Sequence, residues 1–439
     1  MTASTGTATT QIATAQGGEV TVGGGSRIEK PDNIAAVIAE VLTARDFGQS
    51  VSVAAHGYPQ PSADGAVILD LSQLTGLQDA DPKRNEVTFF AGTTVGQATE
   101  LLSAQGLAMI GAPDDPALTL AGAAATGAHG FNPAEPIFSG AIVGISFVTL
   151  RGELKPIDER RNPELWSAAK LSLGSIGVPV TVTVKVRPYA PVQLRHRRRN
   201  IHELLGEFAE ARSKVDFYRV DWRPQSDSAR LTVGWFAAPG ELIQVDEKGA
   251  GQQLALTTGA SRRPKPSRFR RFREAIARKV PFLAPAIARV ANRFEHFGER
   301  TDDTGRTLHG ATIEYYFAAR RMPSLIEGLS ELARLHRGLA SAEVRISLVA
   351  PDDAWVSPGY RAETVAVALS VPESDVEALA DVEELFIWLG GLPNWGYFST
   401  LTGPEAAHVM PRFGDFMHTS ADLDPHGQLR NDLISRLRA

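Results

Sequence analysis

The stretch from Thr119 to Gly130 constrains this chain most strongly. It reads TLAGAAATGAHG and carries no Asp, Glu, Lys or Arg. Glycine has no Cβ and tolerates φ > 0, so this backbone can approach a flat or polyanionic partner closely. Its successive N–H groups can also turn inward as an anion-binding nest. Tight packing of a helix or strand is the alternative explanation for a run of this composition.

A second run of small residues, from Ser172 to Val178, reads SLGSIGV and follows a strand-like segment. Two such runs within one domain indicate a dinucleotide that lies across both. The chain lacks a G-x-G-x-x-G fingerprint between a first strand and helix, which counts against a Rossmann nicotinamide site.

Length and composition set broader limits. With 439 residues the chain is long for one ordinary core, which predicts two domains of roughly 200 residues each. The net charge of −5 argues neither for nor against a polyanionic partner, and we expect no nucleic acid partner and no metal. No apolar run approaches the ~20 residues that span a bilayer, and the first residues lack the features of a signal peptide. We therefore expect a cytoplasmic protein with a disordered tail over residues 1–19.

Helical and strand patterns alternate up to about residue 190. Apolar residues at helical spacing predict a helix from Pro31 to about Arg45, and a second helix is expected from Val95 to Gln105. Buried strands are expected near residues 51–55, 66–71, 86–92, 141–150 and 180–186. Strands and helices in this order, with glycine-rich loops between them, predict an α+β sheet domain.

The passage from Ala91 to Pro188 resembles the flavin domain of the vanillyl-alcohol-oxidase type of FAD-dependent oxidoreductases. Within that family it is most similar to the aldonolactone and alditol oxidase branch. Segments similar to the substrate domain and C-terminal part of that branch follow in the same order, at residues 312–317, 342–347, 351–358, 390–397 and 423–431. The similarity extends from about residue 25 to 435.

The resemblance implies an α+β fold with two main parts. A two-lobed PCMH-type FAD-binding domain is expected over residues 20–190, with lobes at 20–85 and 86–190. A substrate domain built on an antiparallel sheet is expected over 191–400, and residues 401–439 should return to the FAD domain. The cofactor-binding residues expected from the resemblance are His56, Gly57, Tyr58, Thr119, Gly122, Thr126, Gly127, His129, Gly130, Ser172, Gly174, Gly177, Val178 and Asn431.

The resemblance leaves the attachment of FAD open, because the family often carries a histidine bonded to the flavin ring. Counting forward from the preceding strand places Tyr58 at that position, whereas counting back from Asp64 favours His56. A cysteinyl bond is excluded because the chain has no cysteine. Non-covalent FAD is the favoured prediction, and a link through His56 is the alternative.

Glu343 and Arg345 are the main catalytic candidates. They alternate on an expected strand, so both side chains should leave the same face, and an unpaired buried charge there would be costly. A structural salt bridge is one interpretation. The resemblance implies the other, in which Arg345 stabilises negative charge and Glu343 orients or deprotonates a substrate hydroxyl.

Other pocket positions depart from the family pattern. The family's His-Trp-Gly-Lys loop reads Asn394-Trp395-Gly396-Tyr397 here, and a strand that often offers histidine and threonine offers Ala368 and Ser370. We expect substrate contacts from Ala368, Ser370, Asn394 and Trp395, with Tyr397 as a candidate acid/base group. Losing the lysine and histidine predicts a less polar pocket than that of a polyol oxidase.

The resemblance implies oxidation of an alcohol C–OH by hydride transfer to FAD N5, with dioxygen or another compound as electron acceptor. Two alternatives stay open. One is oxidative tailoring of a lipid or secondary metabolite on the same scaffold, and the other is a flavin-binding protein with impaired catalysis.

The segment 262–293 is strongly basic and contains apolar residues at helical spacing. A solvated helix that bridges domains is the favoured interpretation. Contact with an anionic membrane surface is less favoured because Pro281 and Pro285 interrupt the helical pattern, and a nucleic-acid patch is the third alternative.

The attachment of FAD can be tested by acid precipitation of the purified protein. Because Tyr58 best fits the linking position, yellow colour should pass into the supernatant. Colour that stays in the pellet, and is lost from it in His56→Ala, would instead establish the histidyl link.

Overall fold

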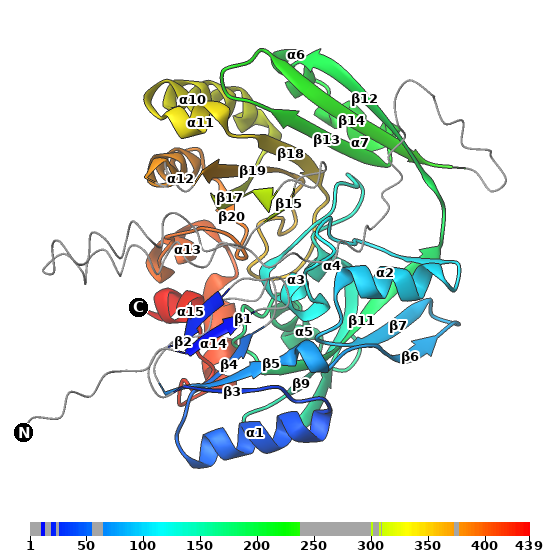
Figure 1. Cartoon of the computed structure of the whole chain (residues 1–439), viewed down its shortest axis with the longest axis vertical. Helices are drawn as coiled ribbons and strands as arrows, with labels where there is room; N and C mark the ends of the chain where they lie inside the picture. The colour runs from blue at the N-terminus through cyan, green and yellow to red at the C-terminus, as the bar shows by residue number, and fades with distance from the viewer. Residues whose placement is uncertain are drawn as a thin grey trace, which may run out of the picture.

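The computed structural model describes residues 10–13, 19–22, 26–54, 65–237, 300–301, 307–308, 310–372 and 377–439. In this part of the chain the strands form three larger sheets and two separate strand pairs. The larger sheets are a three-stranded parallel sheet, a six-stranded antiparallel sheet and a seven-stranded antiparallel sheet. Some helices lie on the outside of these sheets and others lie between them (Figure 1). The predicted α+β class is confirmed.

The three-stranded sheet has the order β3-β5-β4, and the helix α1 crosses between its parallel strands. The side chain of Asn33 caps α1 by accepting a hydrogen bond from the Ala36 N–H, and Val37, Val41 and Ala44 bury one face of the helix. The bounds are β3 Arg27–Glu29, α1 Ile34–Asp46, β4 Val51–Ala54, β5 Val67–Asp70 and the short 3-10 helix η1 Leu71–Gln73.

The six-stranded sheet is built around the long strand β11, which pairs with β7, β8 and β9. Its valines are buried, as expected for a strand covered on both faces. The strands are β6 Leu77–Asp81, β7 Glu86–Phe90, β8 Leu107–Met109, β9 Ile142–Val148, β10 Leu154–Ile157 and β11 Val178–Pro188. The accompanying helices are α2 Val95–Ser103, α3 Leu120–Thr126, α4 Phe138–Ala141 and α5 Pro163–Ala169.

The first small-residue run forms the buried helix α3 rather than an anion-binding nest. Its first amides already have partners: Leu120 donates to the Thr93 carbonyl, and Gly122 donates to the Thr119 hydroxyl. Every residue of α3 is buried, which explains why its side chains are small. Gly127 ends the helix with φ +83°, a left-handed conformation that glycine adopts without strain.

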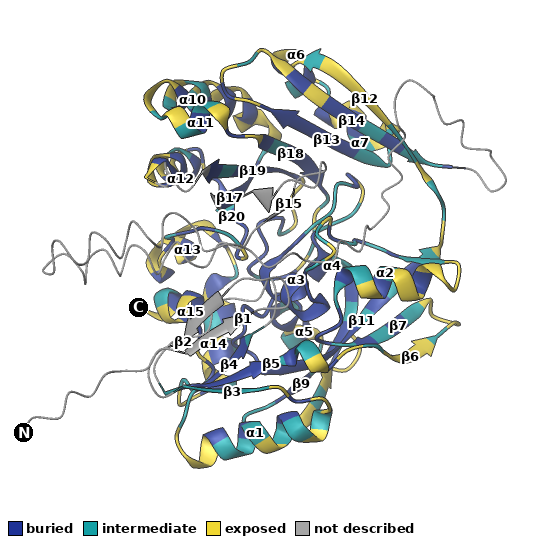
Figure 2. Cartoon of the chain, viewed as in Figure 1, coloured by how far each residue is buried: buried dark blue, intermediate teal, exposed yellow. Residues whose placement is uncertain are grey.

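The seven-stranded sheet has the order β12-β14-β13-β18-β19-β17-β20. Its apolar face packs on the helices α6, α10, α11 and α12, and Figure 2 shows this buried layer in dark blue. The strands are β12 Val192–Asn200, β13 Phe217–Trp222, β14 Ser228–Phe236, β17 Gly310–Phe317, β18 Val344–Val349, β19 Thr364–Pro372 and β20 Leu392–Pro393. The helices are α6 Ile201–Leu205, α7 Phe208–Lys214, η3 Ala319–Arg321, α10 Met322–Leu335, α11 Arg337–Ser341 and α12 Ala378–Trp388.

The C-terminal segment packs against the first two sheets. The backbone of Val51 bonds to Gln428 and Arg430 on either side, at 2.7 and 3.1 Å, so the segment extends the edge of β4. Apolar residues of its helices join the core of the first 190 residues. These helices are α13 Gly403–Val409, α14 Phe413–Leu423 and α15 Asp432–Arg438.

The remaining strand pairs are β1 Thr10–Ala13 with β2 Glu19–Val22, and β15 Arg300–Thr301 with β16 Thr307–Leu308. Among the described residues, no helix combines the length and apolarity that crossing a membrane requires. The same residues include no cluster of three His, Asp or Glu side chains suited to a metal ion. His56, Gly57, Tyr58 and the basic segment 262–293 lie outside the described residues, and the domain limits near 20, 190 and 400 stay predictions.

Asn431 should contribute strongly to stability because it ties the C-terminus to the second small-residue run. Its Oδ1 accepts from the Ile434 N–H to cap α15, and its Nδ2 donates to the Leu173 carbonyl, both at 2.8 Å and buried. Asn431→Ala removes a cap worth about 1 kcal/mol and leaves a buried carbonyl unpaired, so the free energy of unfolding should fall by about 2–4 kcal/mol. The matched control is Asn33→Ala, which removes only an exposed cap and should cost about 1 kcal/mol in urea unfolding. Equal losses in the two variants would contradict the prediction.

Candidate active site

The candidate site forms where the polar face of the seven-stranded sheet meets residues 127–130. Side chains alternate along β17, so Ile313, Tyr315 and Phe317 pack towards the helices. Glu314 and Tyr316 therefore leave the opposite face, towards the glycine-rich segment. Both are buried, with Glu314 only 5% exposed.

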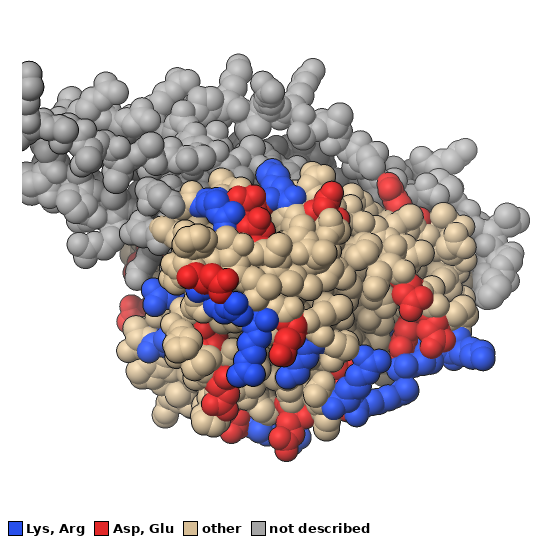
Figure 3. All heavy atoms as spheres, turned by 90° about the horizontal axis from the view of Figure 1, so that it is seen from below, with Lys and Arg blue, Asp and Glu red and all other residues tan. Residues whose placement is uncertain are grey.

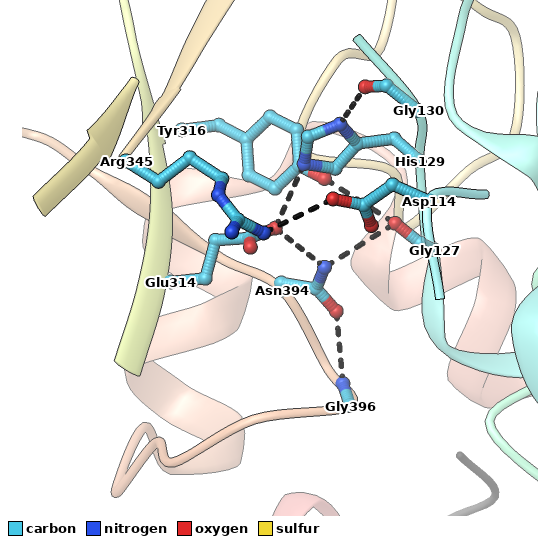
Figure 4. A network of polar contacts seen from close by, with 9 residues as sticks. All are labelled: Asp114, Gly127, His129, Gly130, Glu314, Tyr316, Arg345, Asn394 and Gly396. Atoms are coloured by element: carbon cyan, nitrogen blue, oxygen red, sulfur yellow. Dashed lines mark hydrogen bonds and ion pairs between the residues drawn. The ribbon is translucent and has the colours of Figure 1, made fainter. Parts of the chain in front are cut away.

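Glu314 is the centre of a network of hydrogen bonds (Figure 4). Its Oε1 lies 3.0 Å from Nε2 of His129 and accepts a 2.8 Å hydrogen bond from Nδ2 of Asn394. The Gly127 carbonyl accepts further hydrogen bonds from Asn394 and from the Tyr316 hydroxyl, at 3.4 and 3.3 Å. The network therefore joins the end of α3 to two segments of the second sheet.

Backbone contacts hold these side chains in place. The Asn394 N–H donates to the Glu314 carbonyl at 2.9 Å, next to the pairing of β20 with β17, and the Gly396 N–H donates back to Oδ1 of Asn394 at 3.0 Å. The His129 ring packs edge-on against Tyr316, with ring centroids 5.6 Å apart. Gly396 lies against Thr126, where a Cβ would come within 3.1 Å of the threonine hydroxyl.

His129 lies between two acceptors, the Gly130 carbonyl at Nδ1 and the Glu314 carboxylate at Nε2. An ionised Glu314 in this position requires a proton on both ring nitrogens. Burial lowers the pKa of His129, but the attraction and hydrogen bond of Glu314, with a contribution from Asp114, outweigh it, so the net pKa is raised. Burial, followed by the charge of Glu314, raises the pKa of the Tyr316 hydroxyl well above its ordinary value. The His129–Glu314 contact therefore favours the protonated form of the imidazole.

Arg345 enters the site from β18. Its Nη1 lies 3.1 Å from Oδ2 of Asp114, and one third of its side chain is exposed. A small cavity opens between these groups. It is lined by Asp114, Leu118, Ala128, His129, Glu314, Arg345, Asn394 and Tyr397.

The structure separates the two main catalytic candidates. Arg345 lines the cavity, whereas Glu343 precedes the strand, is 45% exposed and lies 3.6 Å from Arg230. Tyr397 lines the cavity, and its backbone N–H donates to the Asn394 carbonyl at 3.2 Å. The expectation of a less polar pocket than that of a polyol oxidase stays a prediction, and Asp114 and Glu314 join the residues that line the cavity.

The expected substrate residues lie at different distances from the cavity. Asn394 lines it, while Ala368 lies between Arg345 and Glu314 in the cross-strand register. The Ser370 hydroxyl is 2.9 Å from the Thr312 hydroxyl. This pair lies two residues along the strands from the Ala368–Glu314 pair, on the same face of the sheet. Trp395 is outside the lining, because its buried indole donates to the Val356 carbonyl at 2.8 Å.

The two small-residue runs lie against each other. The Leu173 N–H donates to the Ala125 carbonyl at 3.2 Å, and both Leu173 and Gly174 have positive φ. Ser172 and Gly177 are buried in the same loop, and the buried Val178 begins β11. A Cβ at Gly177 would come within 3.0 Å of the Val148 carbonyl. Neither run contains a carboxylate, so neither would repel the pyrophosphate of a dinucleotide cofactor. The residues present fit the FAD expected from the resemblance.

Sequence reasoning missed Asp114, Glu314 and Tyr316. Glu314 and Tyr316 have the same two-residue spacing on an apolar strand as Glu343 and Arg345, which is the signal that could have found them. Asp114 lies in a loop, and no periodic pattern marks it.

Residues 25–157 match the FAD binding domain family. The chain is 23% identical to the L-gulonolactone oxidase of Scyliorhinus torazame, over 91% of each chain. It is 22% identical to the L-gulono-1,4-lactone dehydrogenase of Mycobacterium tuberculosis, over 94% of this chain and 96% of the relative. A D-arabinono-1,4-lactone oxidase of Eremothecium gossypii is 30% identical over 43% of this chain and 36% of the relative.

Solved structures share the fold at low identity. Cholesterol oxidase from B. sterolicum superposes with a TM-score of 0.70 at 14% identity, over 98% of this chain and 97% of that chain. 6-Hydroxy-D-nicotine oxidase from Arthrobacter nicotinovorans gives 0.62 at 18% identity, over 92% and 90%. The protein is thus an FAD-dependent oxidoreductase with the fold of the vanillyl-alcohol-oxidase flavoproteins. Its relatives over the full length are aldonolactone oxidases and dehydrogenases.

Gly127 should be required for FAD loading. A side chain at its φ of +83° costs about 1–2 kcal/mol, and its Cβ would lie 3.3 Å from Ile137. Gly127→Leu should therefore yield folded but colourless protein, measured as the ratio of flavin to protein absorbance. Gly106→Leu is the control, since Gly106 also has positive φ but faces open space. A yellow Gly127→Leu protein would show that this segment does not shape the cofactor site.

The His129–Glu314 pair should make stability depend on pH. Because the folded pKa of His129 is raised above 6.5, its contribution is complete below pH 6.5 and is lost as the pH rises through the folded pKa. Glu314→Gln removes the main attraction that raises the pKa of His129, so burial, which lowers this pKa, dominates. The loss of stability at rising pH should therefore disappear, and the variant should be less stable than the parent protein at pH 6. Urea unfolding between pH 5 and 9 measures both effects. Asp422→Asn, which disturbs the exposed pair with His418, should leave the parent profile unchanged.

Proposed function

We propose that the protein oxidises a C–OH group of a small hydroxylated substrate of the aldonolactone or alditol class, with dioxygen or another compound as final electron acceptor. When bound, FAD supplies the hydride acceptor. The observation that carries this proposal is the Glu314–His129–Asn394 network beside Arg345, at one cavity next to the FAD binding domain. The full-length similarity to aldonolactone oxidases supports the substrate class.

Glu314 and His129 together hold and move the substrate proton. A carboxylate 3.0 Å from an imidazole can take a hydroxyl proton, and the charge of the pair then rises by one as the substrate becomes an alkoxide. Asn394 fixes the Glu314 side chain, so the accepting oxygen stays aimed into the cavity. Removing the hydroxyl proton makes the carbon a better hydride donor.

Arg345 stabilises negative charge on the substrate oxygen. It is the guanidinium in the cavity lining, and it is held by Asp114 rather than buried in the sheet. A preorganised donor at such a position acts most strongly where water is excluded. Tyr397 stays a candidate acid/base group on the same wall. Glu343 lies outside the cavity lining, 3.6 Å from Arg230.

Anaerobic mixing tests the proposed reaction. L-Gulono-1,4-lactone, D-arabinono-1,4-lactone and D-glucitol are offered to the yellow protein, and loss of flavin absorbance is followed in a stopped-flow instrument. At least one of these compounds should bleach the flavin. If none of them or related polyols does so, the protein binds flavin without this activity.

Arg345→Met should slow flavin reduction by about 10²–10³-fold while FAD stays bound, because one charge-stabilising donor is typically worth ~3–4 kcal/mol. Arg334→Met is the control, since Arg334 pairs with Glu331 on the exposed face of α10 and should reduce flavin at the parent rate. A parent-like rate together with a much lower melting temperature in Arg345→Met would identify a purely structural ion pair.

A further inference from the structure

Asp114 holds the guanidinium group of the cavity in an ion pair. Its Oδ2 lies 3.1 Å from Nη1 of Arg345, and Figure 4 shows the carboxylate turned towards the guanidinium. The Asp114 backbone N–H donates to the His129 carbonyl at 3.3 Å, which holds this loop beside the site. Both side chains of the pair line the cavity and stay partly exposed, at 33% for Arg345 and 28% for Asp114. A ligand in the cavity therefore contacts the pair and not an unpaired guanidinium.

The cavity lining has no net positive charge. Four of its described residues can carry a charge at neutral pH, namely Asp114, Glu314, His129 and Arg345. If His129 is protonated the four charges cancel, and if it is neutral one negative charge is left. Neither state attracts an anion. On the face seen from below, basic and acidic side chains are interspersed, so that face adds no field of one sign (Figure 3).

The arginines of the neighbouring sheet depend on Asp114 for their charge balance. The buried Asp221 faces three guanidinium groups at 3.4, 3.2 and 3.8 Å, those of Arg219, Arg230 and Arg345. The carboxylate of Glu343 lies 3.6 Å from Arg230. The sheet thus places two carboxylates beside these three arginines, and Asp114 supplies a third from the other side of the cavity. Removing the charge of Asp114 leaves one positive charge in excess, and it leaves it at the cavity.

The second oxygen of Asp114 favours a ligand that can donate a hydrogen bond. Oδ2 faces Arg345, whereas Oδ1 accepts no hydrogen bond from the residues that the structure describes. A ligand hydroxyl can donate to this oxygen. An ionised ligand carboxylate has no proton to donate, so it would meet Oδ1 with repulsion only.

We propose that Asp114 is a specificity-determining residue, which pairs with Arg345 so that the cavity binds neutral hydroxylated compounds and rejects sugar acids of the same carbon chain. The inference rests on the proposed function, because it takes this cavity as the substrate site. Arg345 still has N–H groups for a substrate oxygen, since a guanidinium carries five. A further substrate hydroxyl donates to Oδ1 of Asp114.

The test compares L-gulono-1,4-lactone with L-gulonate, its open-chain acid, which is ionised at pH 7. Each is titrated by calorimetry into anaerobic holoprotein whose flavin has been reduced with dithionite, so that no oxidation accompanies binding. The parent should bind the lactone at least about tenfold more tightly than gulonate. Asp114→Asn should bind gulonate about tenfold more tightly than the parent does. Its affinity for the lactone should change much less, because the amide oxygen still accepts a hydrogen bond.

Asp115→Asn is the matched control. It removes the same charge from the next residue, which lies outside the described cavity lining and whose Oδ1 accepts from the Ala117 N–H at 3.0 Å. An asparagine keeps that hydrogen bond, so this variant should bind both probes as the parent does. Combining Asp114→Asn with Arg345→Met should abolish the gain in gulonate affinity, because the unpaired guanidinium is then absent.

Three results would each overturn the inference: equal gulonate affinity in the parent and Asp114→Asn, an equal gain in Asp115→Asn, or a gain that survives Arg345→Met. Bleaching of the oxidised flavin by the lactone tests the proposed function separately. A gain in gulonate affinity without bleaching leaves the role of Asp114 standing and removes the proposed oxidation. Bleaching without that gain keeps the proposed function and removes Asp114 as the specificity-determining residue.

Discussion

The contact between Glu314 and His129 is the interaction on which the site depends. It joins a strand of the second half of the chain to the segment that follows α3, and it does so with two buried ionisable groups. A buried carboxylate without partners would be expensive, so the position is tolerated only because His129 and Asn394 satisfy it. The same contact therefore holds the sheet against residues 127–130 and places two groups that can exchange a proton at the cavity. The contact between Nε2 of His129 and Oε1 of Glu314 therefore contributes both to stability and to the proposed chemistry.

Much of the fold could be predicted because it depends on local patterns. The helix α1 begins after Asn33 and ends at Asp46, close to the predicted limits, since capping and apolar spacing are both local. The glycine-rich run was harder, because a nest and a packed helix use the same small residues. The N–H groups of Leu120 and Ala121 donate to the carbonyls of Thr93 and Ala91, so they are not available to bind an anion. These partners are about thirty residues away in the sequence. Composition cannot specify such contacts.

In the candidate site, too, local patterns predicted some residues, whereas others depend on distant contacts. His129 and Arg345 were identified in advance, one beside a glycine run and one on an apolar strand, and both line the cavity. Glu343 was chosen with Arg345 because both leave one face of a strand. That face, however, extends from the cavity to solvent, and Glu343 lies where Arg230 can reach it. Position along a strand predicts the face of a sheet, but register with the neighbouring strands determines which part of that face covers the cofactor segment.

The pairing of β17, β19 and β18 places the small side chain of Ala368 between two charged side chains. It lies between Arg345 and Glu314 in the cross-strand row, so the cationic and acidic side chains are two strand spacings apart, or about 10 Å, with only a methyl group between them. A longer side chain at this position would join the two charges directly and fill the space over the sheet. Asp114 instead engages Arg345 from the opposite side, at the edge of the cavity. The alanine thus keeps acid and cation separate, and the proposed substrate oxygen can contact both only by lying across it.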